Sequence, residues 1–380
     1  MGRQSAIILC VSVAALVSIG LIMLASTSVW VETEDMRYFH VKRQVLWTAV
    51  GLGAAGLLGW MDYRLLRRFW MPILVVVCVL LILCYVPGVG VWRNGETRWI
   101  KLPLLGQFQP SEIAKLGIII AVAAWFAQYQ AEAGGFWRGF VIPGLLLAVP
   151  TGLIFFEKDM GTAAAIGAAG FALMFVAGTR WWWLAGSAIS ALLALRHMVM
   201  MDENRMARIM AFMDLEGTRL GAGLQQFRAM LAFGSGGLTG VGLGNGAEKH
   251  GYLPFAHTDF IFSMIGEELG LVATLGVVFC FVLITVTGLS IALNAPDHFG
   301  RLLGVGVTAV IVIPAIMNIG VTTAMLPNTG LPLPFVSYGG SNLVFTLAAI
   351  GVLVSLHRRA RYVEMAEMPV IKERKLALKI

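Results

Sequence analysis

The stretch that decides the fold is residues 259–293, DFIFSMIGEELGLVATLGVVFCFVLITVTGLSIAL. Its three acidic residues stand near its start, and the rest is a continuous apolar run. A transmembrane helix needs about 20 predominantly apolar residues in a row. The run is therefore long enough to cross a bilayer, and it places the carboxyl group of Asp259 at one membrane surface.

The whole chain shares the character of this segment. Of its 380 residues, 58% are apolar and only 13% are charged, whereas a soluble domain carries roughly 25% charged residues. Such a chain cannot cover a surface that faces water, so the composition excludes a soluble enzyme and a disordered protein. The apolar runs are continuous rather than alternating, which argues against a membrane β-barrel. We therefore predict an all-α polytopic membrane protein.

We expect one membrane domain, residues 1–380, with about ten transmembrane helices. A long loop, residues 202–258, separates the seventh predicted span from the eighth, and its segment 224–233 has apolar residues at helical spacing. A loop of this size with a pattern of its own is usually functional. The predicted spans are Ser5–Val29, Gln44–Trp60, Trp70–Val86, Glu112–Ala127, Arg138–Phe156, Gly161–Gly178, Trp181–Met200, Asp259–Leu293, Arg301–Met325 and Phe335–His357.

The positions of Lys and Arg predict the orientation. Loops on the side of the N-terminus carry 14 of them, seven in the tail 358–380, and short loops on the other side carry seven. Because basic residues favour the cytoplasmic side, both termini should be cytoplasmic and the loop 202–258 extracytoplasmic. The net charge of +7 therefore reports membrane orientation rather than nucleic-acid binding, and the basic tail should lie against an anionic inner leaflet.

The motif HTDFIF, residues 257–262, supplies the main catalytic candidate. A carboxylate at the edge of hydrocarbon is costly to leave charged, so the pKa of Asp259 should be raised, which suits a general base. The alternative is that Asp259 caps the N-terminus of the following helix, since Asp is a favoured cap. The two roles are compatible.

Two further motifs carry charge near membrane spans. In QPSEIAK, residues 109–115, Glu112 and Lys115 share one helix face and should form an ion pair. In EKDMGT, residues 157–162, three charges in a row should be mostly solvated, but Asp159 could reach Lys115. We therefore predict a structural cluster of Glu112, Lys115 and Asp159 that joins two helical hairpins.

The long loop contains a basic set and a glycine-rich run. Arginines beside a membrane suit phosphate binding, although a solvated face or contact with lipid headgroups is the alternative. The run GSGGLTGVGLGNG, residues 234–246, lacks the Gly-Lys-Ser/Thr of a P-loop, so we expect a turn region that lets the backbone approach a ligand or another segment. The basic residues are Arg205, Arg208, Arg219, Arg228 and Lys249.

The four cysteines all lie inside apolar runs. They indicate neither a disulfide nor a metal site.

Taken with LPLPFVSYGGSN, residues 331–342, these motifs resemble those of the SEDS family (FtsW, RodA and SpoVE). Their order and spacing match from about Arg98 to the last span, and they look most similar to the division branch, FtsW. Sequences of that branch usually carry Glu where this chain has Phe255, so a role for an acidic group at that position is in doubt here.

The resemblance implies a peptidoglycan glycosyltransferase of the bacterial cytoplasmic membrane, acting in cell division and cell shape. Its substrates would be lipid II, an undecaprenyl-pyrophosphate-linked disaccharide-pentapeptide, and the growing glycan strand. It also implies a single-span penicillin-binding transpeptidase as partner, beside other division or elongation membrane proteins, and Asp259 as the catalytic residue. With Trp99 matching a tryptophan important in the family, we expect these residues to bind substrate: Arg205, Arg208, Gln226, Lys249, Trp99, His257 and Ser337.

Three alternatives stay open at this point. A RodA-type elongation polymerase would share the same chemistry. A transporter that flips lipid II would need charged residues deep in several spans, and nearly all of those found lie near the predicted outer end. A pure scaffold would not need Asp259.

A divalent cation, Mg²⁺ or Mn²⁺, could assist at the phosphates, but no dedicated ligand set stands out.

Overall fold

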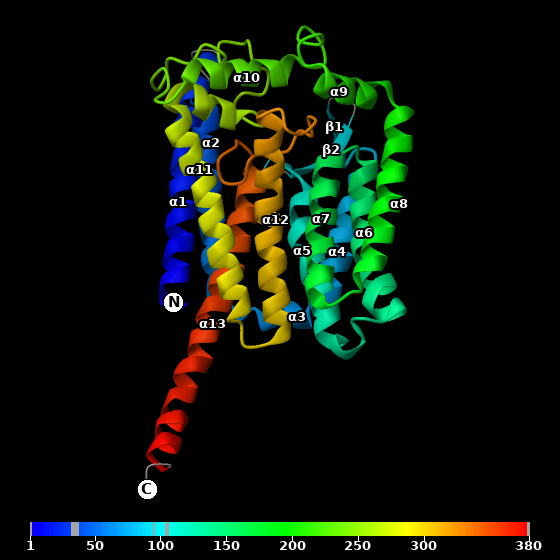
Figure 1. Ribbon diagram of the computed structural model, residues 1–380, viewed down its shortest axis with the longest axis vertical. Helices are drawn as coiled ribbons and strands as arrows, with labels where there is room; N and C mark the ends of the chain where they lie inside the picture. The colour runs from blue at the N-terminus through cyan, green and yellow to red at the C-terminus, as the bar shows by residue number, and fades with distance from the viewer. Residues whose placement is uncertain (1, 32–37, 94–95, 103–105, 378–380) are drawn as a thin grey trace.

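The computed structural model describes residues 2–31, 38–93, 96–102 and 106–377, and these form a bundle of long, roughly parallel helices (Figure 1). The long helices, in chain order, are α1 (Gly2–Val31), α2 (Phe39–Trp60), α4 (Trp70–Leu83), α5 (Pro110–Gln128), α6 (Ile142–Phe156), α7 (Met160–Ala177), α8 (Trp181–Met200), α11 (Ile261–Leu293), α12 (His298–Thr322) and α13 (Gly340–Ala377). Shorter helices are α3 (Arg64–Arg68), α9 (Glu203–Met213) and α10 (Leu224–Gly236).

The all-α polytopic membrane fold is confirmed. Within the described residues, eight helical segments are long and apolar enough to cross a membrane, and the segment that contains α6 begins with a π-helical turn at Trp137. The helices α2 and α4 cover the other two predicted spans. The last helix begins at Gly340 rather than Phe335. Phe335 has a left-handed φ of 66°, and the chain turns there, because the amides of Val336 and Ser337 both donate to the Leu333 carbonyl.

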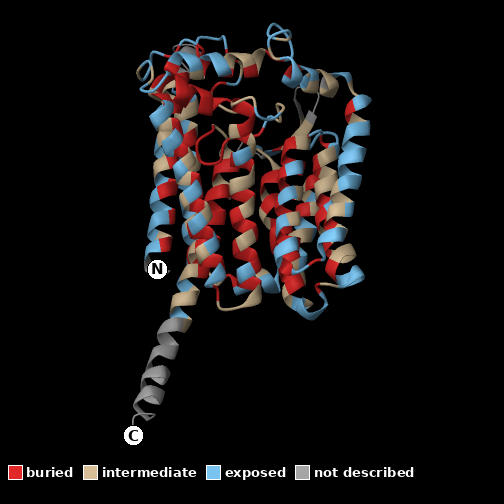
Figure 2. Ribbon diagram, viewed as in Figure 1, coloured by how far each residue is buried: buried red, intermediate tan, exposed pale blue. Residues whose placement is uncertain are grey.

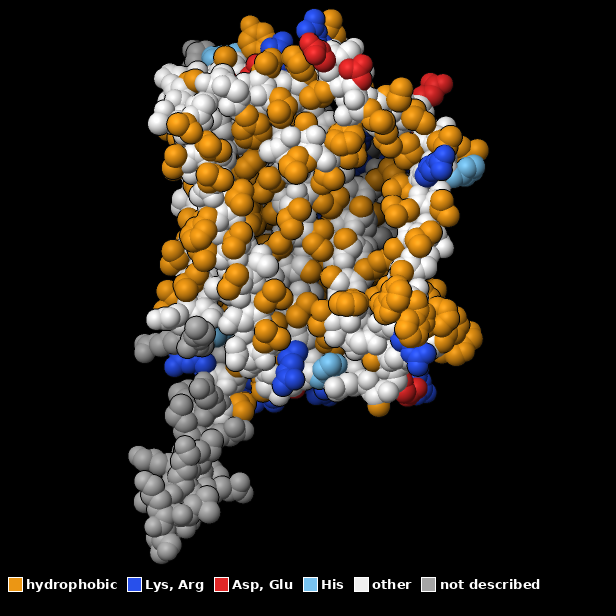
Figure 3. Space-filling model, viewed as in Figure 1, with side chains coloured by type: hydrophobic (Ala, Val, Ile, Leu, Met, Phe, Trp, Pro, Cys, Tyr) orange, Lys and Arg blue, Asp and Glu red, His pale blue; other side chains and the backbone are white. Residues whose placement is uncertain are grey.

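The surface has the pattern of a membrane protein. Buried residues concentrate in the central helices, and α8 is exposed along most of its length (Figure 2). In the face shown in Figure 3, apolar side chains cover the middle of the bundle and charged side chains gather at its two ends. Both chain ends lie at one end of the bundle, and α9 and α10 lie across the other (Figure 1). The tail side chains beyond residue 363 lie outside the part whose side chains the structure describes.

A small sheet, which the sequence did not predict, precedes α5. Strands β1 (Gly90–Arg93), β2 (Glu96–Leu102) and β3 (Gly106–Phe108) pair antiparallel in the order β1-β2-β3. Residue Val91 pairs with Trp99, and Ile100 pairs with Phe108. The sheet lies at the same end of the bundle as α9 (Figure 1), so it brings Arg98 and Trp99 to the end where α11 begins.

The glycine-rich run packs directly against α11. The amides of Val241 and Gly242 donate to the carbonyls of Glu267 and Glu268, both at 3.0 Å. A Cβ on Gly240 would stand 2.2 Å from the Glu268 carbonyl oxygen. At Gly270 the helix kinks, with φ of 76°, a value that glycine adopts readily. The run therefore lets two backbone segments meet, as its composition indicated.

Candidate active site

Asp259 lies in a tight turn, two residues before α11 begins. The carbonyl of Phe255 accepts from the amides of Thr258 at 3.0 Å and Phe260 at 3.4 Å. The Asn318 amide of α12 donates to the Asp259 carbonyl at 2.7 Å. The N-cap of α11 is Phe260, and this helix end has no capping hydrogen bond from a side chain. The capping alternative is therefore wrong, and the carboxylate of Asp259 is available for chemistry.

The surroundings of Asp259 perturb its ionisation. Removal from water, with a smaller contribution from the negative charge of Asp159, raises the pKa of its carboxyl from 3.8 to about 6. The positive charges of Arg98 and Arg208 act in the opposite direction. Elements far apart in the sequence thus place Asp159, Arg98 and Arg208 near enough to Asp259 for their charges to affect its ionisation. A carboxyl group with a pKa near the working pH suits a general base.

Asp159 and Arg98 form a pair that differs from the predicted cluster. The Arg98 guanidinium lies 3.9 Å from Asp159 Oδ1 and donates to the Lys158 carbonyl at 2.7 Å. The carboxylate also caps α7, because its Oδ1 accepts from the Thr162 amide at 3.1 Å, and Gln109 donates to its Oδ2 at 3.2 Å. The expectation that Asp159 would join Lys115 is corrected: its partners come from the sheet, the N-cap of α5 and the start of α7.

The other two members of the predicted cluster do pair. Lys115 Nζ lies 2.8 Å from Glu112 Oε1, both side chains are nearly buried, and Asn342 of α13 donates to Glu112 Oε2 at 3.3 Å. A small cavity between α5, α12 and α13 reaches this pair, and its lining includes Val310 and Phe345. The pair therefore puts a neutralised charge inside the bundle, as the spacing predicted.

Glu157 was expected to be solvated, and the structure places it inside the protein. Its side chain is 2% exposed, and neither carboxylate oxygen has a hydrogen-bond partner among the described residues. Burial, with a smaller contribution from Asp159, raises its pKa to about 8. It is consequently protonated at neutral pH. The sequence signal was present, since Glu157 follows an apolar helix directly, but the neighbouring charges suggested solvent.

The arginines of the long loop differ in what they contact. Arg205 pairs with Asp202 at 3.1 Å and lies over the ring of Phe155. Arg208 acts electrostatically on Asp259. These two therefore lie on the side of the bundle that carries the site. Arg228 instead pairs with Glu248 at 3.4 Å.

Two of the predicted substrate-binding residues are buried and engaged elsewhere. The Gln226 amide donates to the carbonyls of Val321 at 3.0 Å and Leu326 at 2.8 Å, which fastens α10 to the end of α12. Lys249 is ion-paired with Glu268, and both side chains are fully buried. Neither can meet a substrate in this conformation, so the structure gives both residues a structural position.

Two other candidates lie at the turn that holds Asp259, and a third, Trp99, lies in the sheet. The Ser337 hydroxyl donates to the Thr258 carbonyl at 2.6 Å and accepts from the Leu333 amide at 2.8 Å, so it fixes the backbone. His257 contacts His40 and Tyr338 through its ring, and burial lowers its pKa to about 4. Its imidazole is therefore neutral at pH 7. Trp99 is half-buried on β2.

A divalent cation would need several nearby side chains that can act as its ligands. Across the residues that the structure describes, no group of three His, Cys, Asp or Glu side chains could hold a metal ion. The described residues therefore offer no ready-made ligand set for a divalent cation.

These features define a class of protein: a multi-pass, all-helical membrane protein with a carboxylate and arginines gathered where α11 begins. A family model described as "Cell cycle protein", covering FtsW, RodA and SpoVE, matches residues 6–362. The chain belongs to this family.

Individual relatives agree with the family assignment. The chain is 37% identical over 361 residues to the "Probable peptidoglycan glycosyltransferase FtsW" of Geobacter metallireducens, covering 94% of this chain and 96% of the relative. It superposes on a chain from a structure of a peptidoglycan synthase complex with a TM-score of 0.76 at 28% identity, covering 93% and 97%. The rod shape determining protein RodA of Thermus thermophilus gives a TM-score of 0.67 at 30% identity, covering 92% and 95%.

Proposed function

We propose that the chain is an FtsW-like peptidoglycan glycosyltransferase that polymerises lipid II at the outer face of the bacterial cytoplasmic membrane. The observation that carries the proposal is the carboxylate of Asp259, which is free of a capping role and has a pKa of about 6 beside Arg98 and Arg208. Family membership supplies the substrate class, because a curated relative carries that activity in its name.

The chemistry needs a base and a way to steady a leaving pyrophosphate. Asp259 accepts the proton of the acceptor sugar hydroxyl as that oxygen forms a bond to the anomeric carbon of the donor glycan. The bond from the anomeric carbon to the lipid pyrophosphate breaks, and the pyrophosphate leaves with the electron pair. Arg208 and Arg98 stabilise the charge that develops on it. Arg205 extends the positive surface from its place on α9.

The orientation of the chain belongs to the same proposal. Both termini are cytoplasmic, and the loop 202–258 faces outward, where lipid-linked sugars are polymerised. The excess of Lys and Arg on the side of the termini supports this. A reporter enzyme fused at Glu216, in the exposed segment between α9 and α10, should read as extracytoplasmic. A cytoplasmic signal there would overturn the topology and the outer site with it.

A partner is also part of the proposal. The solved structure with the TM-score of 0.76 comes from a peptidoglycan synthase complex that coordinates polymerisation and crosslinking. This likeness supports a partner of the same kind for the chain. We propose that the partner is a single-span penicillin-binding transpeptidase and, because relatives of the chain carry the name FtsW, that the two act at the division septum.

A second candidate function is a transporter that flips lipid II. The observation in its favour is the buried Glu112–Lys115 pair beside a cavity within the bundle, since charged groups deep in a span often mark a pathway. A transporter would move lipid II across a vesicle membrane without joining sugars.

One experiment separates the two functions. The purified protein, its transpeptidase partner and labelled lipid II are reconstituted in vesicles, movement of lipid II across the membrane is followed, and glycan products are separated by length. The parental protein should form polymer, and Asp259→Asn should form at least about 100-fold less, because general-base catalysis typically contributes 10²–10⁴-fold. Polymer formation by Asp259→Asn at the parental rate would refute the base assignment. Flipping by the parental protein without polymer formation would favour the transporter.

A further inference from the structure

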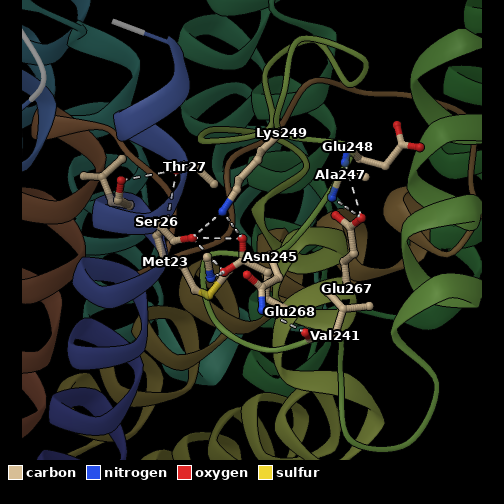
Figure 4. Close-up of polar contacts among 12 residues, drawn as sticks. Met23, Ser26, Thr27, Val241, Asn245, Ala247, Glu248, Lys249, Glu267 and Glu268 are labelled. Atoms are coloured by element: carbon tan, nitrogen blue, oxygen red, sulfur yellow. Dashed lines mark hydrogen bonds and ion pairs between the residues drawn. The ribbon is translucent and has the colours of Figure 1, made fainter. Parts of the chain in front are cut away.

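A fully buried ion pair ties the outer loop to two helices of the bundle (Figure 4). Lys249 Nζ lies 2.7 Å from Glu268 Oε1 on α11, and both side chains are 0% exposed. The Ser26 hydroxyl of α1 donates to the Glu268 carboxylate, 2.7 Å from Oε2, and accepts from Lys249 Nζ at 2.9 Å. Three segments far apart in the sequence therefore meet in one hydrogen-bonded group.

The adjacent acidic residue holds the same part of the loop. Glu267 Oε1 accepts from the backbone amides of Ala247 at 2.7 Å and Glu248 at 3.3 Å. Glu268 Oε2 also accepts from the Gly244 amide at 2.9 Å. We call Ser26, Lys249, Glu267 and Glu268 the clasp, because together they fasten residues 244–249 to α1 and α11.

The clasp closes a ring that contains Asp259. Lys249 and Glu268 are 19 positions apart, and Asp259 lies between them. Within the ring, the Leu253 amide donates to the Glu248 carbonyl at 2.9 Å, and the Phe255 carbonyl holds the turn before Asp259. The path of the chain into Asp259 is thus determined at one end by the clasp and at the other by the start of α11.

Net stabilisation of the fold does not explain why this buried ion pair is present. Replacing a buried pair by apolar side chains of similar volume is often neutral or stabilising, because desolvation of the charges offsets their attraction. A directional pair does determine which loop residue meets which helix residue. Resting on the proposed role of Asp259, we propose that the clasp is a positioning device: Lys249 and Glu268 set the path of the loop so that the Asp259 carboxylate meets the acceptor hydroxyl.

The test replaces the two charged side chains by apolar side chains of similar volume, which removes the directional ion pair. The double variant Lys249→Met/Glu268→Leu, in the full chain with its partner, should fold with a thermal midpoint below that of the parent, because Ser26 and the Gly244 amide lose their acceptor; the rate is therefore measured well below that midpoint. Its kcat should fall about 10- to 100-fold with KM nearly unchanged, the effect of displacing a reacting group by about 1 Å. The acidic side of its pH–rate profile should move, because the carboxylate has moved relative to its neighbours. Lys249→Arg, which keeps the pair, should restore most of the rate.

Two further variants keep the test decisive. If the double variant does not fold, Ser26→Ala replaces it: both charges stay paired, and kcat should fall about fivefold, the rate equivalent of one hydrogen bond. The control is Arg64→Met, which breaks an ion pair to Asp297 at 3.2 Å at the other end of the bundle and should leave kcat unchanged.

The outcomes separate this inference from the proposed function. A folded double variant with parental kcat and an unmoved pH profile, or a change in KM alone, would show that the clasp is only structural. For the replacement, parental kcat in Ser26→Ala would have the same meaning. Asp259→Asn is measured beside them. If that variant polymerises at the parental rate, the base assignment fails. If it is inactive while the double variant is parental, only the positioning role fails.

Discussion

Ionisation of Asp259 should shape the acidic side of the pH–rate profile. Burial and the neighbouring Asp159 raise its pKa from 3.8 to about 6, and a general base works only when deprotonated. A carboxyl group with this pKa is about one-tenth ionised at pH 5 and about nine-tenths ionised at pH 7, so kcat/KM should rise about tenfold between them. A carboxyl group with the ordinary pKa would give a nearly constant rate over that interval.

Neighbouring charges should move this profile in opposite directions. Asp159→Asn removes the negative charge that raises the pKa of Asp259, and Asn can still accept from the Thr162 amide. The ratio of rates at pH 7 and pH 5 should therefore fall below tenfold. Arg208→Gln removes a positive charge that lowers the pKa, so the same ratio should grow, on top of weaker use of the substrate.

The assay is the initial rate of polymerisation at lipid II concentrations below KM, from pH 5 to pH 8. The thermal midpoint is recorded at each pH, so that loss of folded protein is not mistaken for loss of base. A flat parental profile between pH 5 and pH 7 would refute the assignment of Asp259. A profile that shifts in the same direction in Asp159→Asn and Arg208→Gln would refute the electrostatic account of its pKa.

Three other predictions concern stability, each measured as a thermal or denaturant midpoint. The pKa of Glu157 is about 8 in the folded protein against 4.5 ordinarily. Because the folded state holds this proton more tightly, the parent loses stability as the pH rises from 4.5 to 8, whereas Glu157→Gln does not. The midpoint of Glu157→Gln minus that of the parent should therefore increase over this range, and a constant difference would contradict the burial argument. Lys115→Met leaves Glu112 buried without its partner and should lower the free energy of unfolding by about 3–5 kcal/mol. The double variant Lys115→Met/Glu112→Gln should recover most of that loss. Equal midpoints for the single and the double variant would argue against the ion pair. Phe255 has a left-handed φ of 60°, so Phe255→Gly should relieve backbone strain and stabilise the protein by up to about 1 kcal/mol. A lower midpoint for Phe255→Gly would contradict this strain argument.

Most of the helical fold could be predicted because its cause is local. Apolar runs of membrane length are visible in the sequence, and α8 has the predicted bounds, Trp181–Met200. The sheet could not be predicted in this way. Its strands are short, and each gains its hydrogen bonds from another strand, as Val91 does from the pairing with Trp99. Nothing within one strand reports that pairing.

The candidate site was predictable where a residue's own surroundings decide its chemistry. Asp259 stands at the edge of an apolar run, so its raised pKa follows from the sequence. Lys249 and Gln226 appeared exposed because they lie in a long polar loop. Their burial depends on partners elsewhere in the chain, Glu268 and Ser26 for the first and Val321 for the second. The partner of Asp159 was missed for the same reason, since Arg98 reaches it from the unpredicted sheet.

The contact between the glycine-rich run and α11 bears on how this protein can be labelled. A glycine-rich loop is ordinarily a favoured place for insertions, yet a Cβ on Gly236 would stand 1.9 Å from the Gly266 carbonyl oxygen. Gly236, Gly240 and Gly246, where an added Cβ would stand within 2.8 Å of α11, should therefore tolerate substitutions as poorly as the interior of a helix bundle. Affinity tags, fluorophores and spin labels belong instead in the segment 216–222, where Leu220 is 89% exposed.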